Sequence, residues 1–153
     1  MRSKLFVPAS RPELFSKALH SQADGLSFDL EDSVRADKKS EARNQLGEFL
    51  KTDEVRASQK IIIVRVNPMD TPYYMDDMAT VIASGVKIIN IPKAESSEAV
   101  IAVANTVTNL EKQFQSNLDG SGLVQLLINI ETPKSLRLAY ELASADPRVT
   151  GTK

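Results

Sequence analysis

Carboxylate, guanidinium and amide side chains occur where strand-like apolar segments of this chain end. Asp29 and Glu31 close one such segment, Arg65 and Asn67 close the next, and Glu131 directly follows a third. The carboxyl ends of parallel strands meet at one rim of a barrel or one edge of an open sheet, where ligands bind. The spacing therefore predicts that these side chains share one ligand pocket. Because the chain has no cysteine, we expect oxygen ligands for any metal ion held there.

The alternation of side chains along the strands supports this placement. Successive side chains of an extended segment point to opposite faces. In residues 25–31 the apolar face carries Leu26, Phe28 and Leu30, and the polar face carries Ser27, Asp29 and Glu31. Residues 123–131 repeat this pattern, with Glu131 on the polar face. A buried sheet does not normally give one face to carboxylates without a partner or a use, so we expect that face to line the interior.

Strands and helices alternate along the chain and predict a parallel α/β sheet. The strands are expected at residues 4–8, 25–30, 60–67, 86–91 and 123–130, with a sixth beginning at Val149. The helices are expected at residues 10–20, 38–50, 73–83, 96–114 and 132–143, with a polar linker at 51–59 and a turn at 117–122. The run at 60–67 is β-branched without alternation, as a strand covered on both faces requires. Right-handed βαβ crossovers follow from this order.

The expected fold is a partial (β/α)8 barrel, with residues 1–153 forming a single domain of five βα units and the start of strand six. Barrels of this kind usually have about 250 residues and eight units, so we expect a truncated barrel. A complete five-strand flavodoxin-like domain is the alternative. That fold would place a phosphate-cradling glycine loop after the first strand, where this chain has residues 8–12, PASRP.

Composition limits the classes of function. The chain is 42% apolar and 25% charged, and its 19 Lys and Arg nearly balance its 20 Asp and Glu without forming a basic block. We therefore expect no nucleic-acid partner. No apolar run approaches the ~20 residues that a membrane helix needs, and the start of the chain does not predict a signal sequence. We expect no membrane partner and a cytoplasmic location.

Each candidate residue also has a structural interpretation. Asp29, Glu31 and Asp32 are suited to cap backbone N–H groups of the following helix, and Arg65 is suited to be the counter-ion of Glu31. Glu131 is suited to the positive end of the helix that begins after it.

Four further residues are less promising as functional groups. Lys93 and Glu95 are expected to form a solvated pair. His20, the only histidine, is expected to be exposed at a helix end and to be a poor general base. Ser10 is expected to cap the first helix, although a phosphate at that helix start is an alternative.

Five segments resemble those of the citrate lyase beta-subunit-like proteins, which belong to the HpcH/HpaI aldolase and citrate lyase family. They are residues 2–8 with 10–13, 29–34, 64–67, 91–96 and 130–132, in the order and spacing of that family. The resemblance covers essentially the whole chain. It implies a magnesium-dependent (β/α)8 lyase that makes or breaks a C–C bond between a keto acid and an enolate, often that of an acyl-CoA or another acyl thioester.

The resemblance also implies roles for particular residues. Glu131 resembles one of the two metal ligands of the family and lies against the substrate, and the implied cofactor is Mg²⁺. Arg65 resembles the substrate-binding arginine, which holds a carboxylate or the developing enolate oxygen. Glu31 and Asp32 resemble the acidic pair that orients this arginine and the water shell of the metal.

The family's second metal carboxylate lies just after strand six, beyond Lys153. The resemblance therefore implies a lyase whose activity is impaired or absent in this form. The alternative is a non-catalytic half-barrel that works only by pairing with a complementary chain. An open sheet exposes long strand edges that pair readily with other chains, so we expect a homo-oligomer or a complementing chain.

Overall fold

Six parallel strands form one sheet in the computed structural model, which describes residues 1–114 and 123–152. The strands are β1 (Lys4–Pro8), β2 (Gly25–Asp29), β3 (Ile61–Arg65), β4 (Ile88–Ile91), β5 (Gln125–Ile128) and β6 (Val149–Thr152). They lie in the order β1-β2-β3-β4-β5-β6. The predicted parallel α/β sheet is confirmed. The flavodoxin-like alternative is wrong, because a doubly wound sheet reverses its strand order at a switch point and this sheet does not.

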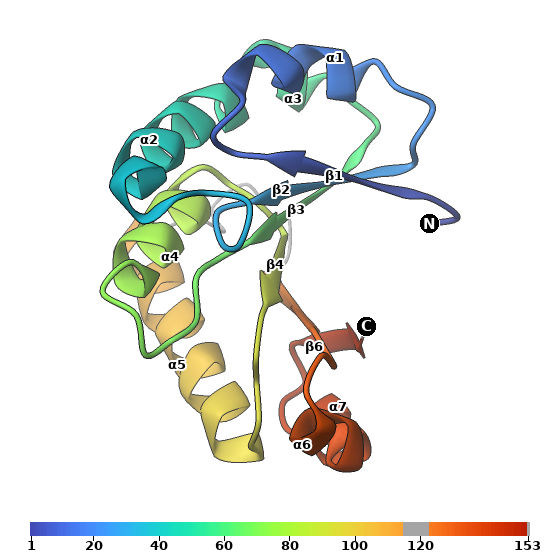
Figure 1. Ribbon diagram of the computed structural model, residues 1–153, viewed down its shortest axis with the longest axis vertical. Helices are drawn as coiled ribbons and strands as arrows, with labels where there is room; N and C mark the ends of the chain where they lie inside the picture. The colour runs from blue at the N-terminus through green and yellow to red at the C-terminus, as the bar shows by residue number, and fades with distance from the viewer. Residues whose placement is uncertain (115–122, 153) are drawn as a thin grey trace.

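Helices follow the strands and cover the outer face of the curved sheet, where α2, α4 and α5 lie side by side (Figure 1). The α-helices are α1 (Phe15–Leu19), α2 (Lys39–Leu50), α3 (Asp53–Arg56), α4 (Tyr74–Ala83), α5 (Ser97–Phe114), α6 (Pro133–Arg137) and α7 (Ala139–Ser144). Short 3₁₀ turns, η1 (Pro12–Leu14) and η2 (Ala36–Lys38), precede α1 and α2. The other face of the sheet is concave and carries the polar side chains of the strand ends.

The hydrophobic core lies between the sheet and this helix layer. Its residues in the strands or directly after them include Leu26, Phe28, Leu30, Val64, Val66, Leu126 and Ile128, all at most 1% exposed. The predicted alternation in β2 is confirmed, because its apolar side chains belong to this core. Phe28 also packs edge-on against Phe15 and Phe49, with ring centroids 5.2 Å and 5.8 Å away.

Some expected elements differ in the structure. The predicted linker 51–59 contains the short helix α3, and the predicted helix 132–143 is divided into α6 and α7. The division falls at Leu138, whose backbone leaves the helical region (φ −102°, ψ 11°). The predicted turn at 117–122 lies outside the described residues.

Hydroxyl side chains cap two of the helices, whereas the expected cap at Ser10 is wrong. Thr132 forms a capping box with Ser135 at the start of α6, and the Ser96 hydroxyl accepts a hydrogen bond from the Ala99 N–H at the start of α5. Ser10 does not cap the first helix, because the chain enters it through a 3₁₀ turn. Its hydroxyl donates instead to the carbonyl of Ser33 (3.4 Å).

No helix within residues 1–114 and 123–152 is long and apolar enough to cross a membrane. The two outer strands of the sheet, β1 and β6, each have one neighbour among the described strands. Both therefore leave one edge of backbone donors and acceptors without a partner strand in this part of the chain.

Candidate functional site

An ion pair between neighbouring strands forms the centre of the polar cluster. Asp29 ends β2 and Arg65 ends β3, and the two residues lie opposite each other in the strand register. Arg65 Nε and Nη2 donate to Oδ1 and Oδ2 of Asp29, both at 2.8 Å. The bidentate geometry fixes the plane of the guanidinium. It leaves Nη1 directed toward the turn that follows β2.

The same Asp29 carboxylate organises the turn that follows β2. It accepts the N–H groups of Glu31 (2.9 Å) and Ser33 (3.0 Å). The predicted cap of the following helix is wrong for Asp29, because the N–H groups it accepts belong to the turn and the helical segment that begins at Ala36 has no side-chain cap. Burial alone would raise the pKa of Asp29, but hydrogen bonds from Arg65, Ser33 and Glu31 lower this pKa below its usual value. The hydrogen bonds to Asp29 in turn raise the pKa of Arg65.

Two further carboxylates, Glu31 and Asp32, lie close both to Arg65 Nη1 and to the ammonium of Lys93. Arg65 Nη1 lies 3.1 Å from Glu31 and 3.7 Å from Asp32. Lys93 Nζ lies 2.8 Å from Glu31 and 3.5 Å from Asp32. The Glu31 side chain is 4% exposed and that of Asp32 61%. Burial raises the pKa of Glu31 despite both cations, whereas contact with Glu31 raises the pKa of Lys93.

Glu131 joins the cluster from the other side of Lys93. The Lys93 N–H donates to Glu131 Oε1 (2.8 Å), and the Asn129 side-chain amide donates to Oε2 (3.3 Å). The backbone of Lys93 has φ 51°, a left-handed conformation that is uncommon for residues other than glycine. This conformation lets Lys93 contact Glu131 through its main chain and Glu31 through its side chain.

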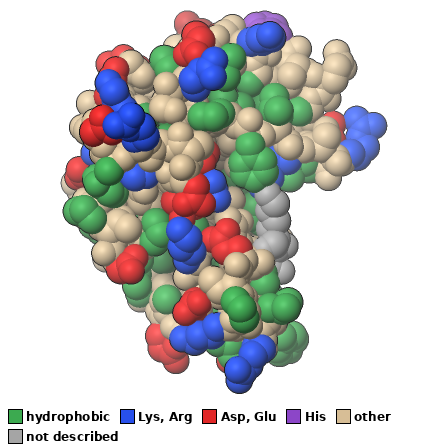
Figure 2. Space-filling view, in the orientation of Figure 1, with side chains coloured by type: hydrophobic (Ala, Val, Ile, Leu, Met, Phe, Trp, Pro, Cys, Tyr) green, Lys and Arg blue, Asp and Glu red, His purple; other side chains and the backbone are tan. Residues whose placement is uncertain are grey.

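The structure thus brings the predicted site residues Arg65, Glu31, Asp32 and Glu131 into one network connected through Lys93. Acidic and basic side chains meet near the middle of the face shown in Figure 2. Four carboxylates, Asp29 with Glu31, Asp32 and Glu131, face Arg65 and Lys93 on this rim, and the Lys39 ammonium lies behind the same turn, which leaves a net charge of −1. A rim of this charge favours binding of a cation.

Asn67 does not join this pocket, contrary to expectation. Its side-chain amide donates to Asp77 of α4 (2.6 Å) and to the carbonyl of Leu30 (3.0 Å), and its N–H also donates to Asp77 (3.0 Å). Arg43 of α2 pairs with the other Asp77 oxygen at 3.0 Å. Asn67 lies beyond the end of β3, where strand alternation no longer fixes the direction of a side chain.

The predicted Lys93–Glu95 pair is also wrong. Glu95 lies 3.7 Å from Lys134 instead. Strand alternation carries no information on Lys93, because this residue follows β4 in a left-handed conformation. The prediction for Arg65 is confirmed in part: it is a counter-ion of Glu31, but its bidentate partner is Asp29. His20 is exposed as expected, with 73% of its side chain accessible.

Glu131 fits a magnesium ligand as a single carboxylate. It is exposed, and each oxygen that accepts one hydrogen bond retains acceptor capacity. Magnesium prefers hard oxygen ligands and usually keeps several waters. Among the described residues there is no group of three or more His, Cys, Asp or Glu arranged to hold a metal. Glu131 would therefore share an ion with water and substrate oxygens.

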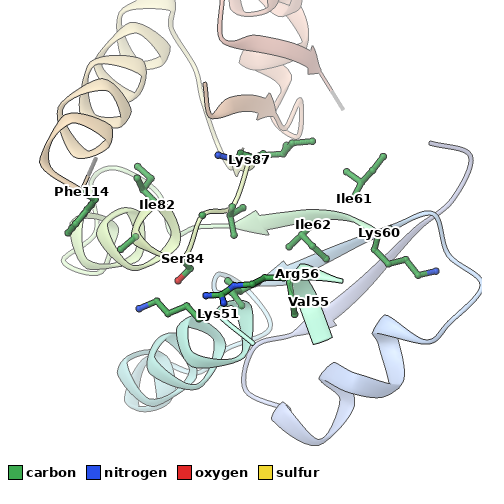
Figure 3. A pocket seen from close by; sticks show the side chains of 15 residues that line it. Lys51, Val55, Arg56, Lys60, Ile61, Ile62, Ile82, Ser84, Lys87 and Phe114 are labelled. Atoms are coloured by element: carbon green, nitrogen blue, oxygen red, sulfur yellow. The ribbon is translucent and has the colours of Figure 1, made fainter. Parts of the chain in front are cut away.

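Two cavities differ in their position relative to the cluster. One, of about 540 Å³, opens beside Lys93 between the loops that follow β3 and β4, and Thr132 also lines it. Another, of about 740 Å³, lies at the opposite ends of β3 and β4, where Lys51, Arg56 and Ile62 line it (Figure 3). Only the first lies on the rim that carries the carboxylates and Arg65.

A parallel sheet whose strands lie in sequence order, with polar side chains gathered at their carboxyl ends, is typical of (β/α) barrels. Residues 2–152 match the HpcH/HpaI aldolase/citrate lyase family, and the chain belongs to this family. It is 31% identical over 150 residues to the citrate lyase subunit beta of Leuconostoc mesenteroides subsp. cremoris, covering 98% of this chain and 48% of that relative. It is 37% identical over 150 residues to a (3S)-malyl-CoA thioesterase of Cereibacter sphaeroides, covering 98% of this chain and 47% of that relative.

A solved structure shares the fold. The citrate lyase beta subunit of Mycobacterium tuberculosis, complexed with oxaloacetate and magnesium, is 30% identical, with a TM-score of 0.72 over 97% of this chain and 55% of the other. The chain therefore spans about half the length of these relatives.

Proposed function

We propose that the rim cluster binds a keto acid with magnesium, as part of a lyase site that makes or breaks a C–C bond between that acid and an acyl-thioester enolate. The supporting observation is the network in which Lys93 connects the Arg65–Glu31 pair with Glu131. It places a guanidinium, an ammonium and a metal-type carboxylate on one rim. Relatives named for citrate, malyl-CoA and oxaloacetate support this class of substrate.

Arg65 would hold a substrate carboxylate or the developing enolate oxygen. Two of its nitrogens are engaged by Asp29, so Nη1 is the group that faces Glu31, Asp32 and an incoming ligand. A guanidinium fixed before substrate arrives loses little side-chain freedom on binding. Glu31 and Asp32 would orient this group and the water around the cation, because they lie beside Arg65.

Glu131 would hold the magnesium ion. When bound, the ion would polarise the keto carbonyl and stabilise the charge that develops as the C–C bond breaks. The Lys93 N–H and the Asn129 amide would keep the Glu131 carboxylate in place. The cavity of about 540 Å³ beside Lys93 offers room for the remainder of a substrate.

Titration calorimetry with magnesium and oxaloacetate tests this proposal. We expect heat of binding for the unaltered chain, and an affinity for magnesium at least about tenfold lower in Glu131→Gln, because the variant loses an anionic ligand. Glu95→Gln is the matched control, since Glu95 pairs with Lys134, and its affinity should be unchanged. Absence of heat in the unaltered chain, or equal affinity in Glu131→Gln, would contradict the proposal.

Binding and catalysis need separate measurements, because a chain that binds the keto acid need not turn it over. Incubation with malyl-CoA and magnesium, followed by chromatography, would detect a C–C cleavage product. Product formation lost in Arg65→Lys would support catalysis by this chain. Binding without product would support an inactive form that retains the site.

The second candidate function is a non-catalytic half-barrel that pairs with a complementary chain. The observation that favours it is the open sheet, in which β1 and β6 each lack a second neighbour among the described strands. Under this candidate the chain would bind magnesium and oxaloacetate only after a partner is added. Calorimetry with and without that partner distinguishes the two functions.

A further inference from the structure

We infer that Lys39 is a positioning residue. Its ammonium fixes the turn that carries Glu31 and Asp32. Lys39 is the first residue of α2 and lies on the helix side of this turn. It touches none of the proposed substrate or metal groups through its ammonium. This inference rests on the proposed function only where ligand binding is concerned, because the geometry of the turn is independent of any ligand.

The position of Lys39 is unfavourable by local criteria. A cation in the first turn of a helix opposes the positive end of the helix dipole, and an ammonium loses solvation when buried. Lys39 is 8% exposed, and burial lowers its pKa even though four carboxylates, Asp77, Asp29, Glu31 and Asp32, act to raise it. A locally unfavourable residue is typical of a position that serves a site.

The ammonium of Lys39 donates to two consecutive backbone carbonyls. Nζ lies 2.8 Å from the oxygen of Leu30 and 2.8 Å from that of Glu31. The Leu30 carbonyl also accepts from Asn67, and the Glu31 carbonyl also accepts the Val34 N–H (3.1 Å). Each carbonyl therefore uses both of its acceptor positions.

The N–H groups of the same two residues are bonded as well. Leu30 N–H donates to the carbonyl of Arg65 (2.9 Å), and Glu31 N–H donates to Asp29 Oδ1 (2.9 Å). All four backbone groups of Leu30 and Glu31 thus have partners, and Lys39 is the one side chain that bonds both carbonyls. Its loss would leave each carbonyl with a single hydrogen bond, and would thereby loosen the turn that holds Glu31 between Arg65 and Lys93.

Native-state amide hydrogen exchange, measured by NMR on the full chain, tests this inference. In Lys39→Met we expect the Glu31, Ser33 and Val34 amides to lose about tenfold or more of their protection, as loss of a hydrogen bond to a charged group predicts. Amides of Phe28, Val64 and Leu126 in the strands should keep theirs. Lys38→Met is the matched control, because the Lys38 side chain is exposed and pairs with Glu41 on the helix surface.

The pattern of exchange separates positioning from general stabilisation. An equal loss of protection in the turn and the strands would show a merely structural role, and no loss in the turn would also overturn the inference. If Lys39→Met does not fold, Lys39→Gln serves instead, since its shorter neutral side chain cannot reach both carbonyls. The same local loss is expected, and a uniform loss or none would overturn the inference.

Calorimetry tests whether the position of this turn affects ligand binding. If the unaltered chain binds magnesium with oxaloacetate, Lys39→Met should bind about tenfold more weakly, and unchanged affinity would overturn the positioning role. If the unaltered chain gives no heat, the proposed function fails, whereas the exchange experiment still decides whether Lys39 fixes the turn.

Discussion

The Asp29 carboxylate links the end of β2, the turn that follows it and the guanidinium of Arg65. It accepts hydrogen bonds from the Arg65 side chain and from two backbone N–H groups of the following turn. Removing one partner of a buried charge pair is more costly than the net contribution of the pair. We therefore expect Asp29 to carry more of the local stability than Glu31, whose pKa is raised by burial.

The lowered pKa of Asp29 predicts a dependence of stability on pH. The contribution of a group whose pKa is lowered by folding is complete above its ordinary pKa, about 3.9 for Asp, and is lost as the pH falls through its folded value. Asp29→Asn should thus lower the free energy of unfolding by about 2 kcal/mol at pH 7. The difference from the unaltered chain should shrink below about pH 4.

Urea unfolding followed by circular dichroism measures this effect, because the chain has no tryptophan for fluorescence. Asp53→Asn is the control, since the Asp53 side chain is 99% exposed and should contribute little. A difference between Asp29→Asn and the unaltered chain that stays constant from pH 7 to pH 3 would rule out the ion pair as its source.

At the scale of elements, helix starts and strand ends decide where the side chains of the site point. Glu131 directly precedes Thr132, whose capping box begins α6. Lys93 follows β4 and lies before Ser96, which caps α5. The two caps therefore fix the helix starts that follow Glu131 and Lys93.

Helix caps give a prediction at this scale. Thr132→Ala should lower the free energy of unfolding by about 1 kcal/mol, because the N–H of Ser135 loses its acceptor. Ser10→Ala should change it by less than about 0.5 kcal/mol, since Ser10 makes only a long bond to Ser33 and caps no helix. Thermal melts of the two variants provide the comparison, and equal losses would argue against the capping assignment.

The elements that the sequence predicts well are those whose pattern is set within one strand or helix. The strand at β3 and the alternation in β2 need only local information, and both are confirmed. The expected cover on both faces of β3 is confirmed only for Ile63 and Val64, since Ile61 is 38% exposed. Asn67 and Lys93 lie past strand ends, so their directions depend on Asp77 from α4 and on a left-handed backbone. The contacts of Lys39 likewise depend on the packing of α2 against the β2 turn, which no local pattern reveals.

At the scale of the molecule, the sheet has a covered outer face and a concave face that is only partly covered. Ile61 at the start of β3 is 38% exposed, and Phe6 of β1 is 46% exposed. Open strand edges and exposed apolar side chains favour association with another chain. The polar rim and this apolar surface are therefore parts of one curved sheet.

Self-association is the prediction that follows. Sedimentation velocity should show oligomers of the unaltered chain whose fraction rises with concentration. Ile61→Lys should reduce that fraction, because a charge on the concave face opposes burial there. Ile101→Lys is the control, since Ile101 is 42% exposed on α5 of the outer layer. A monodisperse monomer of the unaltered chain at all concentrations would contradict the prediction.

The central claim is that the rim cluster holds a divalent cation next to Glu131 and Lys93. Paramagnetic broadening by Mn²⁺, which accepts the same hard oxygen ligands as magnesium, tests it most directly. Titration of the isotope-labelled chain with Mn²⁺ and oxaloacetate should broaden the amides of Lys93 and Glu131 first. The amides of Ile61 and Lys87, at the opposite strand ends, should stay sharp, and excess magnesium should reverse the effect. Uniform broadening, or broadening centred on residues away from the rim, would contradict the claim.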